Sequence, residues 1–450
     1  MVSGENEQSL VHSFRISSVG PGQTLGCDSS YHLTGLDLAM KLHYINGIYF
    51  FDSEASQRVT LPQIKAATFV IFNDYNFTCG RLRREDSGRP FIKCNDCGAR
   101  FVEAECDSTV SEWLEMIGDD WSSMKLLVSQ KVIGPELHFS PPIYMQVTRF
   151  KCKGMSIGLT WAHVLSDAFS PAAFMNSLTN MLFGAPTALT SPPLPSLATI
   201  TTTPPPKPPV SASAKPPLSL RRVDPVGDHW IPTNKYKMES FSFKLNPTQL
   251  ANLQTQMPHQ TPPFESISAA LWHSIAKLRR GSEPTTVTLC KLDSVKQQGK
   301  VIGNTQKVST VRSSAAAVSD VDQRDLAALL VDSAAKDEGE LIEEAVDRDD
   351  GVSDFIVYGA NLTFVKWDEA NLYGDGIMEL DHEKPKFVYY TLHGVGDGGA
   401  VVVIPGPVDD GISGRDDRGR FVTVILPENE VVGLKAELMA NGMFLEKYKE

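Results

Sequence analysis

The 450-residue sequence lacks any apolar run near the roughly 20 residues that a membrane-spanning helix needs. Residues 1–7 also lack the basic and apolar regions of a secretory signal peptide. Cysteine is scarce and odd in number, with seven in the chain, so a disulfide framework is not expected. These absences predict a protein that is not secreted, has no direct membrane span, and is cytoplasmic unless a partner holds it elsewhere.

Basic residues are outnumbered by acidic ones, 42 Lys and Arg against 54 Asp and Glu, which gives a net charge of −12. Because that charge repels a phosphate backbone and no basic patch compensates for it, nucleic acid is not expected as a partner. Hydrophobic residues make up 42% of the chain and charged residues 21%, a balance that excludes global disorder and coiled coils. The length favours two domains.

Proline is concentrated in one segment, residues 191–218, which reads SPPLPSLATITTTPPPKPPVSASAKPPL. Each proline lacks a backbone donor and restrains the residue before it, so neither a helix nor a central strand is expected there. We predict an extended crossover, with a PxxP ligand for an SH3-type module as the alternative. The resulting domains are residues 1–186 and 233–450, joined by a Pro-rich linker over 187–232.

Strand-like and helix-like segments alternate in both halves. Strands are predicted over residues 68–72, 155–161 and 421–426, where β-branched and aromatic residues gather. Helices are predicted over 36–44, 110–117 and 264–280, the last from its apolar residues at three- or four-residue intervals. This alternation predicts an α/β (α+β) fold with two sheet-and-helix domains facing each other.

The strongest candidate for chemistry is His163, in the segment TWAHVLSDAFSP. An apolar strand ends at Trp161, and a helix is expected to begin with Ser170 as its cap and Pro171 in its first turn. His163 therefore falls in a strand-to-helix turn, where open α/β sheets place reacting groups. Its imidazole could accept a proton from an attacking hydroxyl or amine. Asp167 would either fix the ring tautomer or shape the turn by pairing elsewhere.

The His-x-x-x-Asp spacing alone is weak evidence, because a chain of this size produces it by chance. A second copy, His393 to Asp397, lies in a glycine-rich segment. A histidine satisfied by local hydrogen bonds is the competing interpretation of either motif. Cys94 and Cys97 have the spacing of half a zinc ribbon, but four ligands are not evident and no metal site is expected.

Several motifs in a specific order resemble the plant BAHD acyl-CoA-dependent acyltransferase family over nearly the whole chain. The closest likeness is to the eceriferum/glossy branch, which is associated with cuticular wax. The matching segments are His163-x-x-x-Asp167, the proline-rich crossover, Phe264-Glu265-Ser266-Ile267 with Ala270 and Trp272, Leu33 to Asp37 with Tyr49-Phe50-Phe51, Cys94-Asn95-Asp96 with Phe101 to Ala104, Leu36 to Tyr44, and Asn361 to Phe364.

The resemblance implies two chloramphenicol-acetyltransferase-like domains, each a mixed sheet with helices. It also implies a channel between them, and we expect an apolar tunnel that passes His163 and is lined from both halves. Acyl-CoA is the implied substrate or ligand, no cofactor is expected to bind tightly, and the chain is expected to be a monomer by itself. By the same resemblance His163 is the general base, and Asp167 is a structural partner of the turn.

Three departures from the family pattern put turnover in doubt. The residue after Asp167 is usually glycine but is Ala168 here, which would strain a turn that needs positive φ. The arginine that commonly neutralises the motif aspartate is missing from residues 292–297, where only Lys296 stands near it. The family's Asp-Phe-Gly-Trp-Gly motif is degenerate, and the corresponding residues are Leu372, Tyr373, Gly374, Asp375 and Gly376.

Two functions therefore remain open. The first, implied by the eceriferum/glossy branch, is an accessory role in very-long-chain fatty acid elongation for cuticular wax. Its implied partner is a membrane-bound 3-ketoacyl-CoA synthase, the condensing enzyme of the elongase, on the cytosolic face of the endoplasmic reticulum. The second is an active acyltransferase that moves an acyl group from acyl-CoA to a hydroxyl or amine acceptor, with His163 as general base.

Overall fold

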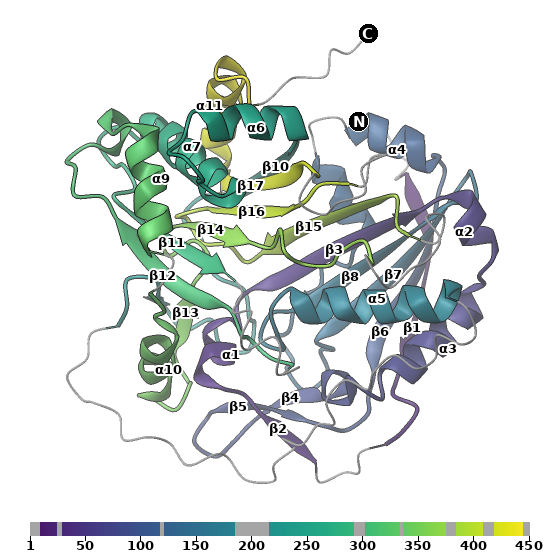
Figure 1. Cartoon of the computed structure of the whole chain (residues 1–450). Coiled ribbons are helices and arrows are strands. Elements are labelled where there is room, and N and C mark those ends of the chain that lie inside the picture. Colours follow the sequence, from purple (N-terminus) through teal and green to yellow (C-terminus); the bar gives the residue numbers. More distant parts are fainter. Residues whose placement is uncertain are drawn as a thin grey trace, which may run out of the picture.

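The computed structural model describes residues 10–24, 29–117, 121–184, 216–291, 302–333, 336–374, 384–407 and 418–443. In this part of the chain, two six-stranded sheets lie beside each other and helices pack on them (Figure 1). Each sheet contains parallel and antiparallel neighbours, as expected for an α/β fold of the mixed type. None of the described helices combines the length and apolar character needed to cross a membrane.

The first sheet is built almost entirely from the N-terminal half of the chain. Its order is β1 (Val11–Val19), β6 (Ala99–Cys106), β7 (Ile143–Phe150), β8 (Met155–Ala162), β3 (Tyr44–Phe51) and β15 (Phe387–His393). The second sheet is built from the C-terminal half. Its order is β10 (Met238–Leu245), β17 (Arg420–Pro427), β16 (Ala400–Pro405), β14 (Leu362–Lys366), β11 (Thr286–Lys291) and β12 (Lys307–Arg312).

Smaller elements complete the fold. Two small sheets are β2 (Ser30–His32), β5 (Pro90–Lys93) and β4 (Arg81–Arg84), and β13 (Asp354–Ile356) with β9 (Arg221–Val223). The helices are α1 (Gly35–Ala39), α2 (Ser53–Gln57), α3 (Leu61–Ile71), α4 (Val110–Ile117), α5 (Phe169–Phe183), α6 (Pro247–Thr255), α7 (Pro263–Leu278), α9 (Gln323–Asp332), α10 (Gly339–Asp347) and α11 (Glu428–Ala440), with the 3-10 turns η1 (Asn76–Cys79), η2 (Trp121–Leu127) and η4 (Val318–Asp320).

Strand β15 links the two sheets, because it belongs to the C-terminal half by sequence but to the first sheet by pairing. It runs antiparallel to β3 with seven residue pairs, from Phe387 opposite Phe50 to His393 opposite Tyr44. Figure 1 shows β15 lying between β3 and β16. The boundary between the two sheets therefore does not coincide with a single position in the sequence.

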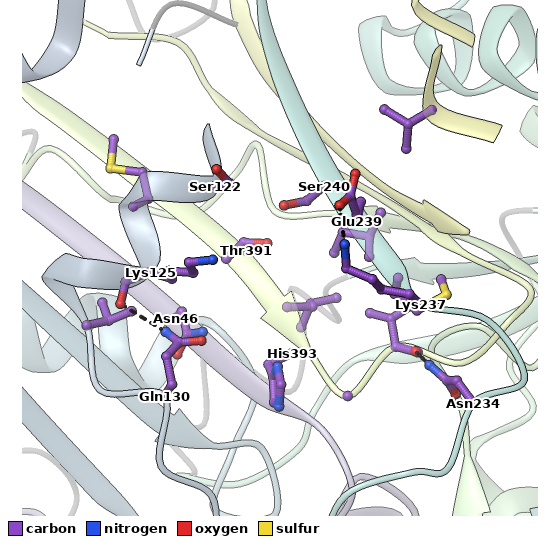
Figure 2. A pocket seen from close by; sticks show the side chains of 18 of the residues that line it. Asn46, Ser122, Lys125, Gln130, Asn234, Lys237, Glu239, Ser240, Thr391 and His393 are labelled. Atoms are coloured by element: carbon purple, nitrogen blue, oxygen red, sulfur yellow. Dashed lines mark hydrogen bonds and ion pairs between the residues drawn. The ribbon is translucent and has the colours of Figure 1, made fainter. Parts of the chain in front are cut away.

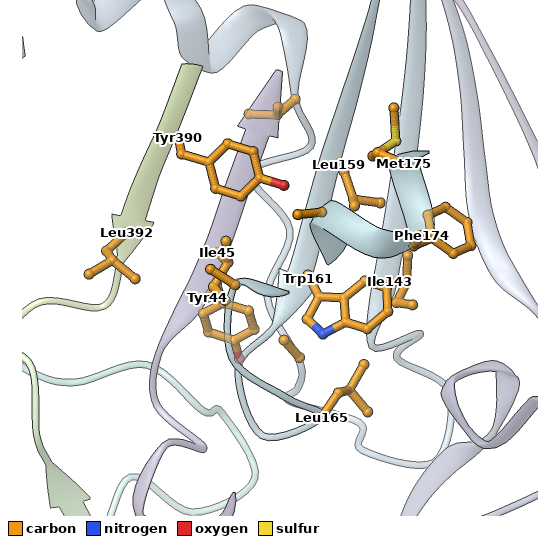
Figure 3. Close-up of a cluster of buried hydrophobic side chains, with 14 of the residues drawn as sticks. Tyr44, Ile45, Ile143, Leu159, Trp161, Leu165, Phe174, Met175, Tyr390 and Leu392 are labelled. Atoms are coloured by element: carbon orange, nitrogen blue, oxygen red, sulfur yellow. The ribbon is translucent and has the colours of Figure 1, made fainter. Parts of the chain in front are cut away.

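Two apolar cores form on the sheets. The first core lies between the first sheet and helices that include α5, with Trp161 close to Phe174 (Figure 3). The second core surrounds α7, whose residues Phe264, Ile267 and Leu271 have no exposed surface. Their three- and four-residue spacing predicted this helix, and the structure confirms it within two residues at its C-terminal end.

Other predicted elements agree less evenly with the structure. The strands over 155–161 and 421–426 correspond to β8 and β17, and the helix over 110–117 is α4. The helix over 36–44 is correct only in its first half, because α1 ends at Ala39 and β3 begins at Tyr44. The proline-rich segment lies outside the described residues up to position 215.

The strand predicted over 68–72 is wrong, because these residues lie at the end of helix α3. A capping box of Thr60 and Gln63, with Pro62 in the first turn, begins this helix. Its buried residues Ile64, Thr68 and Ile71 recur with helical spacing, while Phe69 and Val70 are about half exposed. Helical periodicity therefore outweighs the β-branched composition of the segment.

Strand β8 has a glycine where the chain of η2 crosses it. A Cβ at Gly158 would lie 2.0 Å from the carbonyl oxygen of Leu127. We therefore expect Gly158→Ala to lower the free energy of unfolding by about 1–3 kcal/mol, as measured by urea denaturation. Gly433→Ala is the control, since its Cβ would meet only the mobile end of Leu278. A Gly158→Ala protein as stable as the native chain would contradict this packing.

Candidate functional site

His163 is the residue that follows strand β8, in the turn before helix α5. Its peptide N–H donates to the carbonyl oxygen of His43 at 3.0 Å, and its side chain has no exposed surface. Trp161 fixes the turn from the strand side, because its indole N–H donates to the Ser166 hydroxyl at 3.0 Å. The position at a strand end agrees with the sequence, but the ring does not reach solvent.

The His163 ring contacts a tyrosine hydroxyl rather than open space. Its Nε2 lies 2.9 Å from the Tyr358 hydroxyl, which in turn donates to Gln306 Oε1 at 2.9 Å. Because the hydroxyl proton is used on Gln306, Nε2 must carry the proton of its own bond to the hydroxyl oxygen. Nδ1 then holds the lone pair and makes no hydrogen bond of good geometry, although the His163 carbonyl and the Asn304 side chain interact with the ring and oppose the fall of its pKa on burial.

Asp167 does not contact the His163 ring. Its Oδ1 accepts from the peptide N–H of Phe169 at 3.2 Å, and its Oδ2 accepts from the peptide and hydroxyl of Thr305 at 2.9 and 2.8 Å. Asp167, and not the expected Ser170, supports the start of α5, which begins at Phe169. Ala168 has a φ of −64°, so its Cβ causes no strain in this turn.

A second buried carboxylate lies on the other side of the same segment. Asp37 Oδ1 accepts from the peptide and side-chain N–H groups of Asn304 at 3.2 and 2.8 Å. The Asn304 amide also donates to the His163 carbonyl oxygen at 2.9 Å. Burial raises the pKa of both Asp37 and Asp167, and the hydrogen bonds from Asn304 and Thr305 oppose that rise. Residues 304–306 therefore tie the C-terminal half to the histidine turn.

His43 holds the backbone that carries the tyrosine. Its Nδ1–H donates to the Gly394 carbonyl at 3.0 Å, and its Nε2 accepts from the peptide N–H groups of Val357 and Tyr358 at 3.1 and 3.3 Å. Tyr358 is thus fixed at its main chain by one histidine and at its hydroxyl by the other. Burial lowers the pKa of His43 to about 3 and that of His163 to about 4.

The cavity between the two sheets lies away from this ring. Its volume is about 730 Å³, and residues of both halves line it (Figure 2). Asn46 of β3 and Lys125 of η2 come from the N-terminal half, whereas Glu239 of β10 and His393 of β15 come from the C-terminal half. His163 is not among the residues that line this cavity, and its ring contacts the Tyr358 hydroxyl. The expected tunnel past His163 stays a prediction.

The degenerate motif of residues 372–376 is only partly described. Leu372 and Tyr373 are buried, and Gly374 has a positive φ of 70°, whereas Asp375 and Gly376 lie outside the described residues. The Tyr373 hydroxyl accepts from the peptide N–H of Val388, so this segment supports β15. Residues 292–297, including Lys296, also lie outside the described part.

The cysteine pair lies in the turn that connects β5 and β6. Cys94 is buried and Cys97 is exposed, and positive φ angles at Asp96 and Gly98 shape the turn. Within the described ranges, no three His, Cys, Asp or Glu side chains are grouped so that they could hold a metal ion.

Sequence reasoning missed the residues that surround His163. Tyr358, Gln306 and Asn304 come from distant positions and follow no spacing that links them to the motif. His43 gave one signal, since a polar residue between Leu42 and Tyr44 interrupts an apolar run. Such a residue predicts a buried hydrogen bond but not its partner.

The hydrogen-bond chain predicts the protonation state of the His163 ring. We expect the Nε2–H tautomer, with Nδ1 unprotonated, because Tyr358 donates its only proton to Gln306. Nitrogen-15 NMR of histidine-labelled protein measures the tautomer directly, with His163→Gln used to assign the resonance. A protonated Nδ1 at neutral pH would contradict the arrangement.

Burial of the two imidazoles predicts a pH dependence of stability. Unfolded histidine takes up a proton near pH 6.5, whereas folded His163 does so only near pH 4. The free energy of unfolding should therefore fall as the pH drops from 6.5 to about 4, by about 3 kcal/mol for His163 alone. Urea denaturation across this range should show a smaller slope for His163→Gln, with the exposed His259→Gln as control. If the free energy of unfolding of His163→Gln depends on pH as steeply as that of the native chain, His163 is not buried in its neutral form.

Comparison with known proteins places this arrangement in a family. The family model described as "Transferase family" matches residues 17–440. Protein ECERIFERUM 26-like of Arabidopsis thaliana is 38% identical, with 96% of each chain covered. Protein ECERIFERUM 2 of the same plant is 34% identical, over 96% of this chain and 99% of that protein.

Solved structures agree on the architecture. Vinorine synthase superposes with a TM-score of 0.67 at 16% identity, covering 96% of this chain and 98% of that one. TRI101 of F. graminearum, in complex with coenzyme A and deoxynivalenol, gives 0.64 at 13% identity, covering 90% and 97%. These likenesses confirm the predicted chloramphenicol-acetyltransferase-like fold with two sheet-containing domains. The chain belongs to the Transferase family, that is, the BAHD acyltransferases that its motifs resemble.

Proposed function

We propose that this protein acts in very-long-chain fatty acid elongation for cuticular wax, as an accessory factor of the elongase rather than through turnover at His163. One observation carries the proposal: the Tyr358 hydroxyl occupies Nε2 of a completely buried His163. The relatives named ECERIFERUM support the connection with wax.

Acyl transfer would need a different state of this ring. A general base requires a nitrogen lone pair within hydrogen-bond reach of the acceptor's proton. Here Nε2 carries a proton and faces Tyr358, and the lone pair of Nδ1 is buried. Freeing Nε2 would break the hydrogen bond from His163 and displace a tyrosine whose backbone is held by His43. Each buried group left unpaired costs about 1–3 kcal/mol.

An accessory role needs binding surfaces rather than a free base. The proposed ligand is an acyl-CoA, a class suggested by the coenzyme A in the TRI101 complex. The proposed partner is a membrane-bound 3-ketoacyl-CoA synthase, the condensing enzyme of the elongase. Association with that enzyme would place the protein on the cytosolic face of the endoplasmic reticulum.

Active acyl transfer is the second candidate, and the retained His163-x-x-x-Asp167 motif favours it. In that reaction the acceptor hydroxyl or amine would attack the thioester carbonyl of acyl-CoA. His163 would take the acceptor's proton, and coenzyme A would leave as the thiol. The candidate requires Tyr358 to move away before the acceptor binds.

Substitution of His163 separates the two functions in a host that reports wax chain length. An accessory protein with His163→Gln should still extend the chains, because glutamine can donate to the Tyr358 hydroxyl in place of Nε2–H. Loss of a general base should instead reduce a catalysed rate by about 10²–10⁴ and abolish the product. His259→Gln is the control for an exposed histidine.

A second measurement decides the matter if the variant accumulates poorly. Purified native protein is mixed with acyl-CoA and a fatty alcohol, and release of free thiol is followed. Thiol release that depends on the protein and on the alcohol would refute the accessory proposal, whatever the variant does in the host.

A further inference from the structure

The connection between helix α7 and strand β11 contains a short basic segment that ends in an exposed serine. Residues 279–282 read Arg-Arg-Gly-Ser, and nowhere else in the chain do two arginines stand two and three positions before a serine or threonine. Arg280 and Ser282 are exposed, and Gly281 between them has a positive φ of 89°. The chain therefore presents a serine hydroxyl at its surface directly after two guanidinium groups.

Few hydrogen bonds hold this serine in its turn. The Ser282 peptide N–H donates to the Arg279 carbonyl oxygen at 2.8 Å, and the Ser282 hydroxyl donates to the same oxygen at 3.4 Å. The next anchor is Glu283, whose carboxylate accepts from the peptide N–H and the hydroxyl of Ser319. A protein kinase binds its substrate as an extended segment. Residues 280–282 can extend at the cost of the two bonds to Arg279, because surface turns with few hydrogen bonds open easily.

A hollow beside the serine is lined by the same two arginines. Its volume is about 500 Å³, and it lies where the end of α7 meets the start of α11. Arg279, Arg280 and Ser282 line it together with two carboxylates, Glu430 and Asp397. Arginine binds phosphate through paired N–H donors. A phosphate on Ser282 would therefore have room in this hollow and two guanidinium groups beside it.

We propose that Ser282 is a phosphorylation site for a serine/threonine kinase that selects basic segments. Acidic side chains in the cleft of such a kinase pair directly with the exposed Arg280, and with Arg279 in place of Glu430. The Ser282 oxygen attacks the γ-phosphorus of ATP, the bond from that phosphorus to the β,γ-bridging oxygen breaks, and ADP leaves. The hydroxyl proton passes to the catalytic aspartate of the kinase. The site does not depend on either function considered above.

Phosphorylation of Ser282 changes the ion pair that joins α7 to α11, two helices that pack against each other (Figure 1). Arg279 Nε donates to both carboxylate oxygens of Glu430 at 2.9 and 3.1 Å, and its Nη2 donates to one of them at 2.7 Å. Its Nη1 also donates to the Gly398 carbonyl oxygen at 3.1 Å. A phosphate carries a charge of about −1.5 to −2 at neutral pH, so it attracts Arg279 and repels Glu430. The phosphorylated chain therefore holds the start of α11 less tightly.

Phosphorylation of the full chain in vitro tests recognition of the segment. The probe is the catalytic subunit of cAMP-dependent kinase, which selects arginines at these two positions, and peptide mass spectrometry locates the phosphate. We expect phosphate at Ser282, and Arg280→Gln should slow its incorporation at least about tenfold, because one charged pair with the kinase is lost. Arg312→Gln, at an exposed position of β12, should leave the rate unchanged.

The same serine should carry phosphate in a plant cell. The full chain is purified from a plant host in the presence of phosphatase inhibitors, and the peptide that contains Ser282 is analysed by mass spectrometry. Ser282→Ala should remove the phosphate from this peptide. Ser314→Ala is the control, since Ser314 is exposed but has an arginine only two positions before it.

Urea denaturation measures the effect on the junction of the two helices. In the unmodified protein Glu430→Gln should lower the midpoint of unfolding, because it removes the ion pair with Arg279. In the phosphorylated protein the same change should lower the midpoint by a clearly smaller amount. Glu437→Gln is the control within α11, since Glu437 pairs with Lys277 and its effect should be equal in both states.

Each result bears on the proposal. Absence of phosphate from Ser282 in the kinase reaction would show that the serine is not accessible, and its absence from the host protein would refute the modification. Equal rates for the native chain and Arg280→Gln would overturn recognition by the arginines. An effect of Glu430→Gln that phosphorylation leaves unchanged would overturn the link to α11.

Discussion

The hydroxyl of Tyr358 joins parts of the chain that are far apart in sequence. Its oxygen accepts a hydrogen bond from His163, in the turn after β8, and its O–H donates to Gln306, which precedes β12. His43, just before β3, holds the same tyrosine by its backbone. The contact between the two sheets near His163 is therefore a chain of directed hydrogen bonds, in which each member fixes the orientation of the next.

Two buried carboxylates make the alignment of the two sheets near His163 specific. Asp37 and Asp167 are both buried, and residues 304–305 supply donors to each. A carboxylate buried without such donors would cost several kcal/mol, so any shift of this segment by one residue would be strongly disfavoured. Apolar packing alone tolerates small displacements, whereas paired donors and acceptors allow one alignment. The polar junction thus defines how the two apolar cores meet.

Elements that depend on a local residue pattern could be predicted from the sequence. Apolar spacing located α7, and a strand followed by a turn located His163. The strand predicted at residues 68–72 is wrong, because the capping box of Thr60 and Gln63 starts a helix that runs through the β-branched segment. The role of Tyr358 could not be predicted from the sequence, because its partners His163 and Gln306 are distant in the chain and meet it only in the folded protein. The cavity is lined by Asn46 of β3 and by Thr391 and His393 of β15, and only the register of these two strands brings the three residues together.

The pairing of β15 with β3 bears on how the protein is synthesised. The N-terminal sheet cannot be completed until residues 387–393 have left the ribosome, long after β3 has emerged. Throughout that interval the hydrogen-bonding edge of β3 is unpaired, and both β3 and its neighbour β8 consist of residues that the folded protein buries along the whole strand. Open edges of this kind attract other chains. A nascent chain stalled before this point would therefore be a natural client for chaperones, even though most of its first core is already present.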